Sequence, residues 1–219
     1  LSKGKKQGHR VPEALAWDDL TGMSLDAGKV REAREKEVRY IRDKKVYRKI
    51  PRSQVTSNGW KIIRIRWIDN NKGDDVNPNY RSRLVGKEFH NEQMEGLFAG
   101  TPPLEAPRSL VHEAATVRYD EPIGSKVIMI HDVARALCEA PVVRNVCLEI
   151  PAEDKEEADV RHDKVGHLQM SLYGTRDAAM NWQEEVARVM LKHGFKRGRY
   201  NPCLYYHCDK RIENVLTWR

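Results

Sequence analysis

Apolar residues recur at helical spacing in two long segments of the chain. Between residues 27 and 45 they fall on one side of a predicted helix, at Val30, Ala33, Val38 and Ile41. Residues 177–193 repeat the pattern, with an expected inner stripe of Trp182, Val186 and either Val189 or Met190. Gly194 follows directly, where a glycine in the left-handed conformation commonly closes a helix. The pattern therefore predicts two amphipathic helices, with a shorter third at 108–119.

Strict alternation of apolar and polar residues predicts a two-stranded ribbon in the first half of the chain. In 61–67, isoleucines and Trp67 alternate with Arg64 and Arg66. After a turn at 70–73, residues 80–89 resume an extended pattern with cations at alternate positions, namely Arg81, Arg83 and Lys87. The ribbon is therefore predicted to carry positive charge on one face. The alternative interpretation is an ordinary solvated cationic face that binds no ligand.

Further strands are predicted in the second half of the chain. The apolar run 127–130 predicts a buried strand over 126–131 that ends at Asp132. Residues 145–150 alternate and can pair with 167–172, whereas 203–208 and 215–218 predict a hairpin. Short strands and helices in this mixture indicate an α+β fold, in which helices pack on one face of an antiparallel sheet.

The charge of the chain favours a polyanionic partner. Its 219 residues carry a formal charge of +7, with a pI of about 9.2. Basic residues crowd 29–52 and return in the ribbon, whereas acidic residues collect at 153–159. No apolar run approaches the ~18 residues of a membrane span, and no signal-peptide pattern follows the basic start. The four cysteines form no Cys-x-x-Cys pair, so we expect free thiols. Together, these features predict a soluble intracellular protein with no membrane partner.

The sharpest chemical feature is an acidic residue at the end of the predicted buried strand. Asp132 follows the apolar run directly. Two-metal phosphoryl-transfer sites place one carboxylate in this way, because a rigid strand then ends where hydrated Mg²⁺ can bind. The competing interpretation is an aspartate that caps the next turn. One carboxylate is not a two-metal site, so at least one more must come from elsewhere in the chain.

Four motifs resemble, in the same order, those of one polymerase family. Tyr80-Arg-Ser-Arg-Leu-Val-Gly-Lys-Glu-Phe89 resembles Lys-Ala-Arg-Leu-Val-Ala-Lys-Gly-Phe, and His131-Asp-Val-Ala-Arg-Ala136 resembles the metal-binding Asp-Val-x-x-Ala motif. Ser171-Leu-Tyr-Gly-Thr-Arg-Asp-Ala-Ala-Met-Asn-Trp182 resembles Ser-Leu-Tyr-Gly-Leu-Lys-Gln-Ala-Pro-Arg-x-Trp. His193-Gly-Phe195 and Asn201-Pro-Cys-Leu-Tyr205 resemble Gly-Phe and Asp-Pro-Cys-Leu-Tyr at matching distance. Over about 27–208 the chain resembles the reverse transcriptase domain of copia-type retrotransposons.

The resemblance implies roles for individual residues. Asp132 would bind catalytic Mg²⁺, with the carbonyl oxygen of Val133 as a further ligand. Cations of the ribbon would contact the phosphates of the template or the triphosphate, and Gly174 would let the backbone approach the nucleotide or the template base. The expected nucleotide- or template-binding residues are Arg81, Arg83, Lys87, Leu137, Gly174 and Asp177.

Three positions of the chain depart from the family's motifs. Leu137 stands where the family has the Phe or Tyr that lies under the sugar, so sugar selection is expected to differ. Asp177 stands where the family has Gln, which places a negative charge near the expected path of a triphosphate. Glu88 stands where the family usually has Gly.

The resemblance also implies an architecture and partners. We expect reverse-transcriptase fingers and an incomplete palm, with a linker at 1–26, a fingers-like basic region at 27–119 and a partial palm at 120–219. The expected partners are an RNA or DNA template–primer, deoxynucleoside triphosphates, and the integrase and RNase H regions of the same Pol polyprotein. The expected location is a cytoplasmic particle or the nucleus.

The implied function is that of an RNA-directed DNA polymerase, a nucleotidyltransferase of a transposable element. The family's second acidic cluster, a Tyr-x-Asp-Asp turn, is expected after the strand at 215–218, and the sequence stops at Arg219. We therefore expect this polypeptide alone to be inactive. The alternative is a non-catalytic remnant that binds nucleic acid through residues 29–87. A third interpretation, an unrelated basic α+β module, requires the ordered motifs to be a coincidence.

Overall fold

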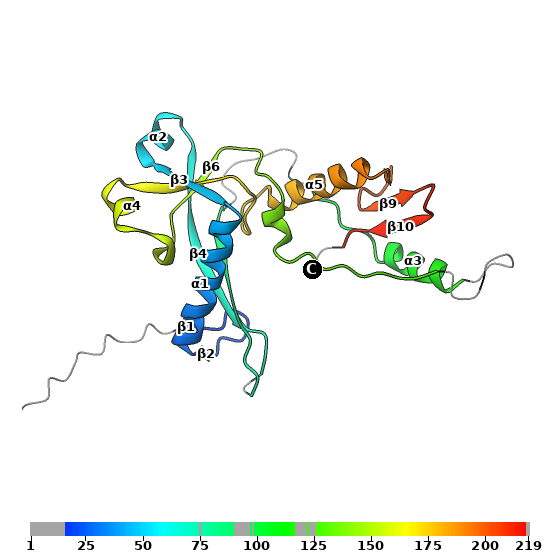
Figure 1. Cartoon of the computed structure of the whole chain (residues 1–219), viewed down its shortest axis with the longest axis horizontal. Coiled ribbons are helices and arrows are strands. Elements are labelled where there is room, and N and C mark those ends of the chain that lie inside the picture. The colour runs from blue at the N-terminus through cyan, green and yellow to red at the C-terminus, as the bar shows by residue number, and fades with distance from the viewer. Residues whose placement is uncertain are drawn as a thin grey trace, which may run out of the picture. The chain divides into compact units, whose positions relative to one another are not determined.

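The structure is a computed structural model that describes residues 16–74, 76–89, 97, 99–116, 122 and 126–217 (Figure 1). The chain divides into two compact units. Residues 1–87 and 146–167 form the first unit, and residues 88–145 and 168–219 form the second. This division differs from the contiguous regions expected from the sequence, because the segment 146–167 returns to the first unit. Among the described helices, none is both long and apolar enough to cross a membrane.

A five-stranded sheet organises the first unit. Its order is β3 (Tyr47–Pro51), β7 (Lys164–Leu168), β6 (Val146–Leu148), β4 (Lys61–Asn71) and β5 (Tyr80–Lys87). The predicted pairing of 145–150 with 167–172 is confirmed, since β6 and β7 pair antiparallel with Cys147 opposite His167. The prediction of an antiparallel sheet is wrong, because β6 runs parallel to β4. A parallel pair needs a long connection, which the chain provides by passing through the second unit between these strands.

The first helix forms as the sequence predicts. Helix α1 (Ala27–Asp43) packs against β5 and lies along the β4–β5 hairpin (Figure 1). Its predicted inner stripe is confirmed, because Val30, Ala33, Val38 and Ile41 are all buried. The carboxylate of Asp26 caps the helix by accepting a hydrogen bond from the backbone N–H of Lys29 at 2.8 Å.

Short elements complete the first unit. Helix α2 (Arg52–Ser57), the 3₁₀ turn η2 (Ala152–Asp154) and helix α4 (Glu157–Arg161) lie between the strands along the chain. A small core of Ile50, Val55, Cys147 and Val165 is covered by Trp60 and Ile62. The strands β1 (Ala16–Trp17) and β2 (Ser24–Leu25) form a hairpin within the segment expected as a linker. The remainder of that segment, residues 1–15, lies outside the described residues.

The β1–β2 hairpin is attached to β4 through two aspartates. Asp18 accepts hydrogen bonds from the backbone N–H groups of Asn71 at 2.8 Å and Thr21 at 2.9 Å. These bonds lower the pKa of Asp18 to about 2. Asp19 accepts a hydrogen bond from the backbone N–H of Asp69 at 2.8 Å. The segment therefore satisfies backbone donors of β4 that would otherwise be unpaired.

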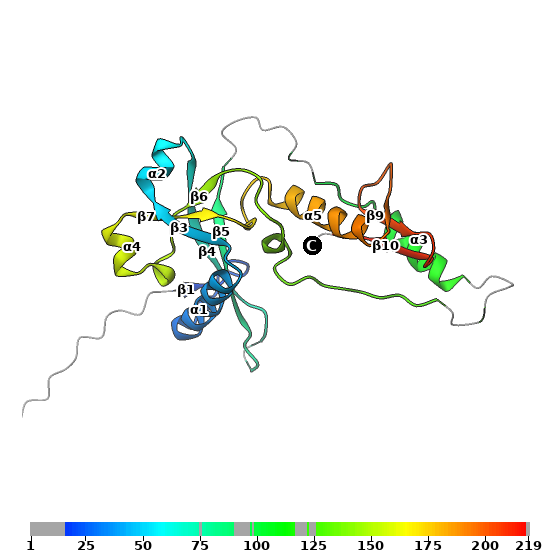
Figure 2. The same cartoon turned by 45° about the horizontal axis from the view of Figure 1, so that its top comes forward.

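The second unit contains a three-stranded sheet and two longer helices. The sheet has the order β10 (Ile212–Val215), β9 (Leu204–His207) and β8 (Lys196–Arg197), so a C-terminal hairpin forms as predicted, but its second strand lies at 212–215 rather than at 215–218. Helix α3 (Glu105–Ala115) lies beside β10 (Figure 2). A 3₁₀ turn, η1 (Ala136–Glu139), packs against helix α5 (Ala178–Lys192).

Helix α5 is confirmed, together with its glycine cap. Gly194 has a φ of +85°, and the N–H groups of Gly194 and Phe195 donate to the carbonyls of Leu191 and Met190. The buried face differs from the predicted stripe, because Trp182 is buried whereas Val189 is 39% exposed. Asn181 and Gln183 take buried positions instead, because Asn181 donates a hydrogen bond to Ser171 Oγ and Gln183 accepts one from the backbone N–H of Gly100.

The predicted buried strand at 126–131 is absent from the described structure. This segment has no regular secondary structure and appears as plain coil (Figures 1 and 2). Val127 and Ile130 are 83% and 92% exposed. A strand needs hydrogen-bonding neighbours, and the three-stranded sheet of this unit does not include the segment. Both the predicted strand and its predicted burial are therefore wrong, because an apolar run does not identify the partner strand that would bury it.

Candidate functional site

The β4–β5 hairpin carries five cations on one face. Residues directly opposite in an antiparallel pair have side chains on the same face. The register places Arg64 opposite Lys87, Arg66 opposite Val85, Ile68 opposite Arg83 and Asn70 opposite Arg81. The predicted cationic face is therefore confirmed, and both strands contribute to it. We call this face the open face; its cations are Arg64, Arg66, Arg81, Arg83 and Lys87.

The opposite face of the hairpin fixes this orientation. It carries Trp67 opposite Leu84 and Asp69 opposite Ser82, and α1 packs against it. Leu84 is fully buried and Asp69 is 5% exposed. A register slip by one residue would exchange the two faces and expose these side chains, so burial against α1 holds the cations on the other side.

Most cations of the open face have no carboxylate neighbour. No described carboxylate forms an ion pair with Arg64, Arg81 or Lys87, and these three side chains are exposed. The nearest acid to Arg66 is Asp19, whose Oδ1 lies 3.8 Å from its Nη1. Cations gathered in this way raise the local concentration of anions and bind phosphate oxygens through charge-assisted hydrogen bonds.

The paired part of the hairpin has no aromatic side chain between the cations of the open face. Beside the five cations, the register places Ile68, Asn70 and Val85 on this face. Stacking of unpaired bases requires aromatic rings, whereas contacts to phosphate require only cations and donors. Within its paired residues, the open face therefore offers cations and hydrogen-bond donors but no aromatic ring.

The second basic region of the sequence, 29–52, has a different environment. Arg34 forms ion pairs with Asp69 at 2.6 Å and Glu153 at 3.0 Å. Arg52 forms a bidentate pair with Glu149, with both N–O distances at 2.9 Å. Arg42 pairs with Asp154. These basic side chains are committed to acids of the segment 149–164 and to Asp69, so they add little to a surface that could bind a polyanion.

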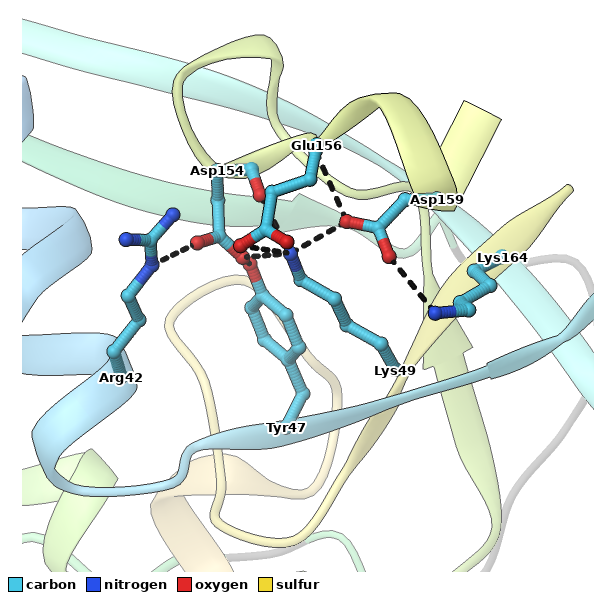
Figure 3. Close-up of polar contacts among 7 residues, drawn as sticks. All are labelled: Arg42, Tyr47, Lys49, Asp154, Glu156, Asp159 and Lys164. Carbon is cyan, nitrogen blue, oxygen red and sulfur yellow. Dashed lines mark hydrogen bonds and ion pairs between the residues drawn. The ribbon is translucent and has the colours of Figure 1, made fainter. Parts of the chain in front are cut away.

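Two buried carboxylates lie at the centre of this internal network (Figure 3). Asp154 is 1% exposed; its Oδ2 accepts a hydrogen bond from the Tyr47 hydroxyl at 2.6 Å. Lys49 donates to Asp159 Oδ2 and to the carbonyl of Asp154, both at 2.6 Å. Lys164 Nζ lies 3.2 Å from the other oxygen of Asp159. The network therefore fastens the segment 149–164 to β3.

The network lowers the pKa of Asp159 although this carboxylate is buried. Burial opposes the ionisation of Asp159, but hydrogen bonds from Lys49, the backbone N–H of Glu156 and Lys164 outweigh it and lower its pKa to about 2. Burial and the hydrogen bond to Asp154 raise the pKa of the Tyr47 hydroxyl above its usual range. Sequence reasoning missed this network, although acidic and basic clusters of similar size were its visible signal.

Asp132, the expected metal ligand, lies exposed on the irregular segment of the second unit. Val133 is 46% exposed. Among the described residues, no three His, Cys, Asp or Glu side chains are grouped so that they could hold a metal ion. Mg²⁺ is usually bound by one or two carboxylates together with waters and substrate phosphates. Asp132 supplies one carboxylate, so the described donors do not by themselves form a resident Mg²⁺ site.

Two further predicted residues share one turn of the second unit. Gly174 has a φ of +79°, a conformation that favours glycine. Asp177 is 3% exposed; its two oxygens accept hydrogen bonds from Arg144 at 2.8 Å and Asn181 at 3.1 Å. Leu137 is half-buried in η1. The sequence did not single out Arg144.

The structure therefore brings some of the predicted site residues together and leaves others apart along the chain. Arg81, Arg83 and Lys87 share the open face of the first unit, and Gly174 and Asp177 share a turn of the second. Asp132 and Leu137 lie on the segment that precedes and enters η1.

The family assignment follows from comparison with known proteins. A family model described as reverse transcriptase (RNA-dependent DNA polymerase) matches residues 46–216, well over half of the 219 residues. The chain has no significant match among curated proteins or among solved structures. The matched range contains β4, β5, Asp132 and the turn with Gly174. The chain belongs to the reverse transcriptase (RNA-dependent DNA polymerase) family.

Proposed function

We propose that this chain is the RNA-directed DNA polymerase domain of a copia-like retrotransposon polyprotein and that it binds a template–primer through its open face. The observation that carries the proposal is that a family motif coincides with the strand that forms the open face. The motif at 80–89 lies inside the matched range 46–216, and its strand places Arg81, Arg83 and Lys87 on one face, where Arg81 and Lys87 are exposed and Arg83 is half-buried. The order of the four motifs favours the copia-type branch. Such a domain would work inside the cell beside integrase and RNase H regions.

Backbone recognition suits a polymerase that must accept any template. Phosphate contacts fix the position of a nucleic acid without reading its sequence. Each phosphate that a cation neutralises releases counterions, so affinity falls with salt by a slope of about 0.9 per contact on a duplex. The five cations of the open face therefore predict steep salt dependence.

Salt titration of template–primer binding tests the interface. In fluorescence anisotropy with an RNA–DNA template–primer, the triple reversal R81E/R83E/K87E should weaken binding at low salt by about 100-fold and reduce the salt slope by about 2 to 3. The matched control is K192E/K196E/K210E, which makes the same change in net charge at exposed positions of the second unit. An equal loss in both triples would show that net charge alone drives binding and would overturn the interface.

We further propose that these 219 residues alone bind template–primer without extending it. Bound Mg²⁺ supplies charge stabilisation to phosphoryl transfer, worth several kcal/mol, and Asp132 is a single exposed carboxylate. Primer extension with deoxynucleoside triphosphates and Mg²⁺ should therefore yield no product, even where anisotropy shows the template–primer bound. Extension that Asp132→Ala abolishes would overturn this second proposal and leave the binding interface intact.

A further inference from the structure

Two acidic residues of the second unit depart from the family motifs, and both are buried. Glu88 replaces the Gly of the Lys-Gly-Phe motif, and Asp177 replaces the Gln that follows Ser-Leu-Tyr-Gly-Leu-Lys. Their side chains are 0% and 4% exposed. A buried carboxylate is costly unless it is paired and hydrogen-bonded. The two departures are far apart in the sequence, so their burial in one place requires an explanation.

One guanidinium group joins the two departures. Arg144 Nη1 lies 2.7 Å from Glu88 Oε1, and its Nη2 bonds the other oxygen of the same carboxylate. The same Nη2 donates to Asp177 Oδ1 at 2.8 Å. Bidentate pairs between arginine and a carboxylate are among the strongest hydrogen-bonded contacts in proteins. These contacts keep the pKa of Arg144 above its usual range, with the bonds to Glu88 as the largest cause.

The same groups hold the backbone of the turn 171–177. Glu88 accepts a hydrogen bond from the backbone N–H of Arg176 at 3.0 Å, and its own N–H donates to the carbonyl of Gly174 at 3.4 Å. On the helix side, Asn181 Nδ2 donates to Asp177 Oδ2 at 3.1 Å and to Ser171 Oγ at 3.0 Å. Both ends of the turn are therefore bonded to the cluster around Arg144.

We propose that Arg144 is a positioning residue that fixes the turn 171–177 by holding Glu88 and Asp177 together. The two acidic residues depend on the same guanidinium, so the three positions form one set. This role rests on the proposed polymerase function in one respect, since that function supplies the nucleotide or template that the turn would face. It also explains how an acid is tolerated at position 177, because Arg144 and Asn181 bind its two oxygens.

Removal of Arg144 should make the stability of this region fall as pH rises. In Arg144→Met, the buried carboxylates of Glu88 and Asp177 lose their shared cation. Protonation of these carboxylates then removes the cost of burying an unpaired negative charge. A carboxyl whose pKa is higher in the folded than in the unfolded state stabilises the fold at low pH, and that stabilisation is lost as pH rises through the folded pKa. The charged groups bonded in the cluster are Glu88, Arg144 and Asp177, with Arg176 joined through its amide.

The test compares melting temperatures across pH. At pH 7.5, Arg144→Met should melt about 10 °C below the parent, and the gap should narrow by at least half at pH 5. Arg144→Lys should recover part of the loss, because a lysine can pair with only one carboxylate at a time. The triple variant R144M/E88G/D177Q should lose the pH-dependent deficit. Hydrogen exchange at the Arg176 amide should accelerate in Arg144→Met and return toward the parent rate in the triple variant.

Two results would overturn the proposal. One is a gap between Arg144→Met and the parent that does not change with pH. The other is a triple variant that shows the same deficit as Arg144→Met. If Arg144→Met does not fold at pH 7.5, the single variants Glu88→Gln and Asp177→Asn provide the test, since each should melt above Arg144→Met at pH 5. None of these measurements requires nucleic acid, so failure of template–primer binding would leave them interpretable.

Discussion

The first unit carries arginine and lysine side chains in two regions, and the two regions differ in what surrounds the positive charge. In the internal network, Lys49 and Lys164 lie within 3.2 Å of carboxylate oxygens of Asp159, which is 2% exposed. On the open face, the residue directly opposite Arg64 is Lys87, another cation. The cations of the first region are paired with acids of the same unit, whereas Arg64, Arg81 and Lys87 of the second region are exposed and form no ion pair with a described carboxylate.

The comparison shows that a count of basic residues does not locate an interface. The region 29–52 and the hairpin are both rich in cations. The acids of 149–164 fold back onto α1 and β3, so the first region is a structural element of the fold (Figure 3). Removing one partner of a buried pair leaves an uncompensated charge, whereas removing an exposed cation costs almost nothing in stability. Stability and binding should therefore respond to different cations.

The largest expected effect comes from breaking the internal network at Lys49. In Lys49→Met, Asp159 loses the 2.6 Å contact and Asp154 loses the donor to its carbonyl. We expect a loss of about 3 kcal/mol in the free energy of unfolding, because Asp159 stays buried with one cation fewer. Urea unfolding followed by circular dichroism measures it, and template–primer affinity of the folded protein should stay within about twofold of the parent.

The matched control for this change lies on the open face. Lys87→Met removes the same side chain from an exposed position and should alter stability by no more than about 0.5 kcal/mol, while weakening template–primer binding. Equal losses of stability in the two variants would contradict the distinction between the regions. Loss of binding in Lys49→Met alone would move the interface to the internal network.

Local periodicity explains which parts of the fold the sequence predicted. The inner stripe of α1, the two faces of the β4–β5 hairpin and the cap at Gly194 each depend on residues close together in the chain. For the same reason the alternate positions of Arg81, Arg83 and Lys87 were sufficient to predict a cationic face. Here the sequence and the structure agree because a single period determines which side is buried.

Long-range partners explain what the sequence did not predict. Strand β6 pairs parallel with β4 although the whole stretch 88–145 separates them along the chain, and no local pattern indicates that pairing. Residues 127–130 are apolar, yet they are exposed. The acids at 153–159 were visible as a cluster, but their partners Arg42 and Lys49 are about 110 residues away. Burial of a charge depends on such partners, and periodicity carries no information about them.

A smaller effect on stability is expected from adding a methyl group at Gly166, beside the ring of Tyr47. Gly166 lies in β7, where an added Cβ would come within 2.8 Å of Tyr47 Cδ2 and 3.0 Å of Leu148 Cδ1. Contacts below 3.0 Å force a neighbour to move, and the ring of Tyr47 is held at its far end by Asp154. We expect Gly166→Ala to cost about 1 to 3 kcal/mol in the free energy of unfolding, measured by urea titration.

A double-mutant cycle with Tyr47 shows whether this cost is transmitted through the network. If the added methyl acts by displacing the ring, Gly166→Ala in a Tyr47→Leu background should cost at least about 1 kcal/mol less than in the parent. Tyr47→Phe provides the matched control, because it keeps the ring and removes only the hydroxyl that donates to Asp154. In that background the methyl should cost nearly as much as in the parent. A cost that is the same in all three backgrounds would place the strain on Leu148 instead, and would separate the packing of β7 from the ion pairs that distinguish this region from the open face.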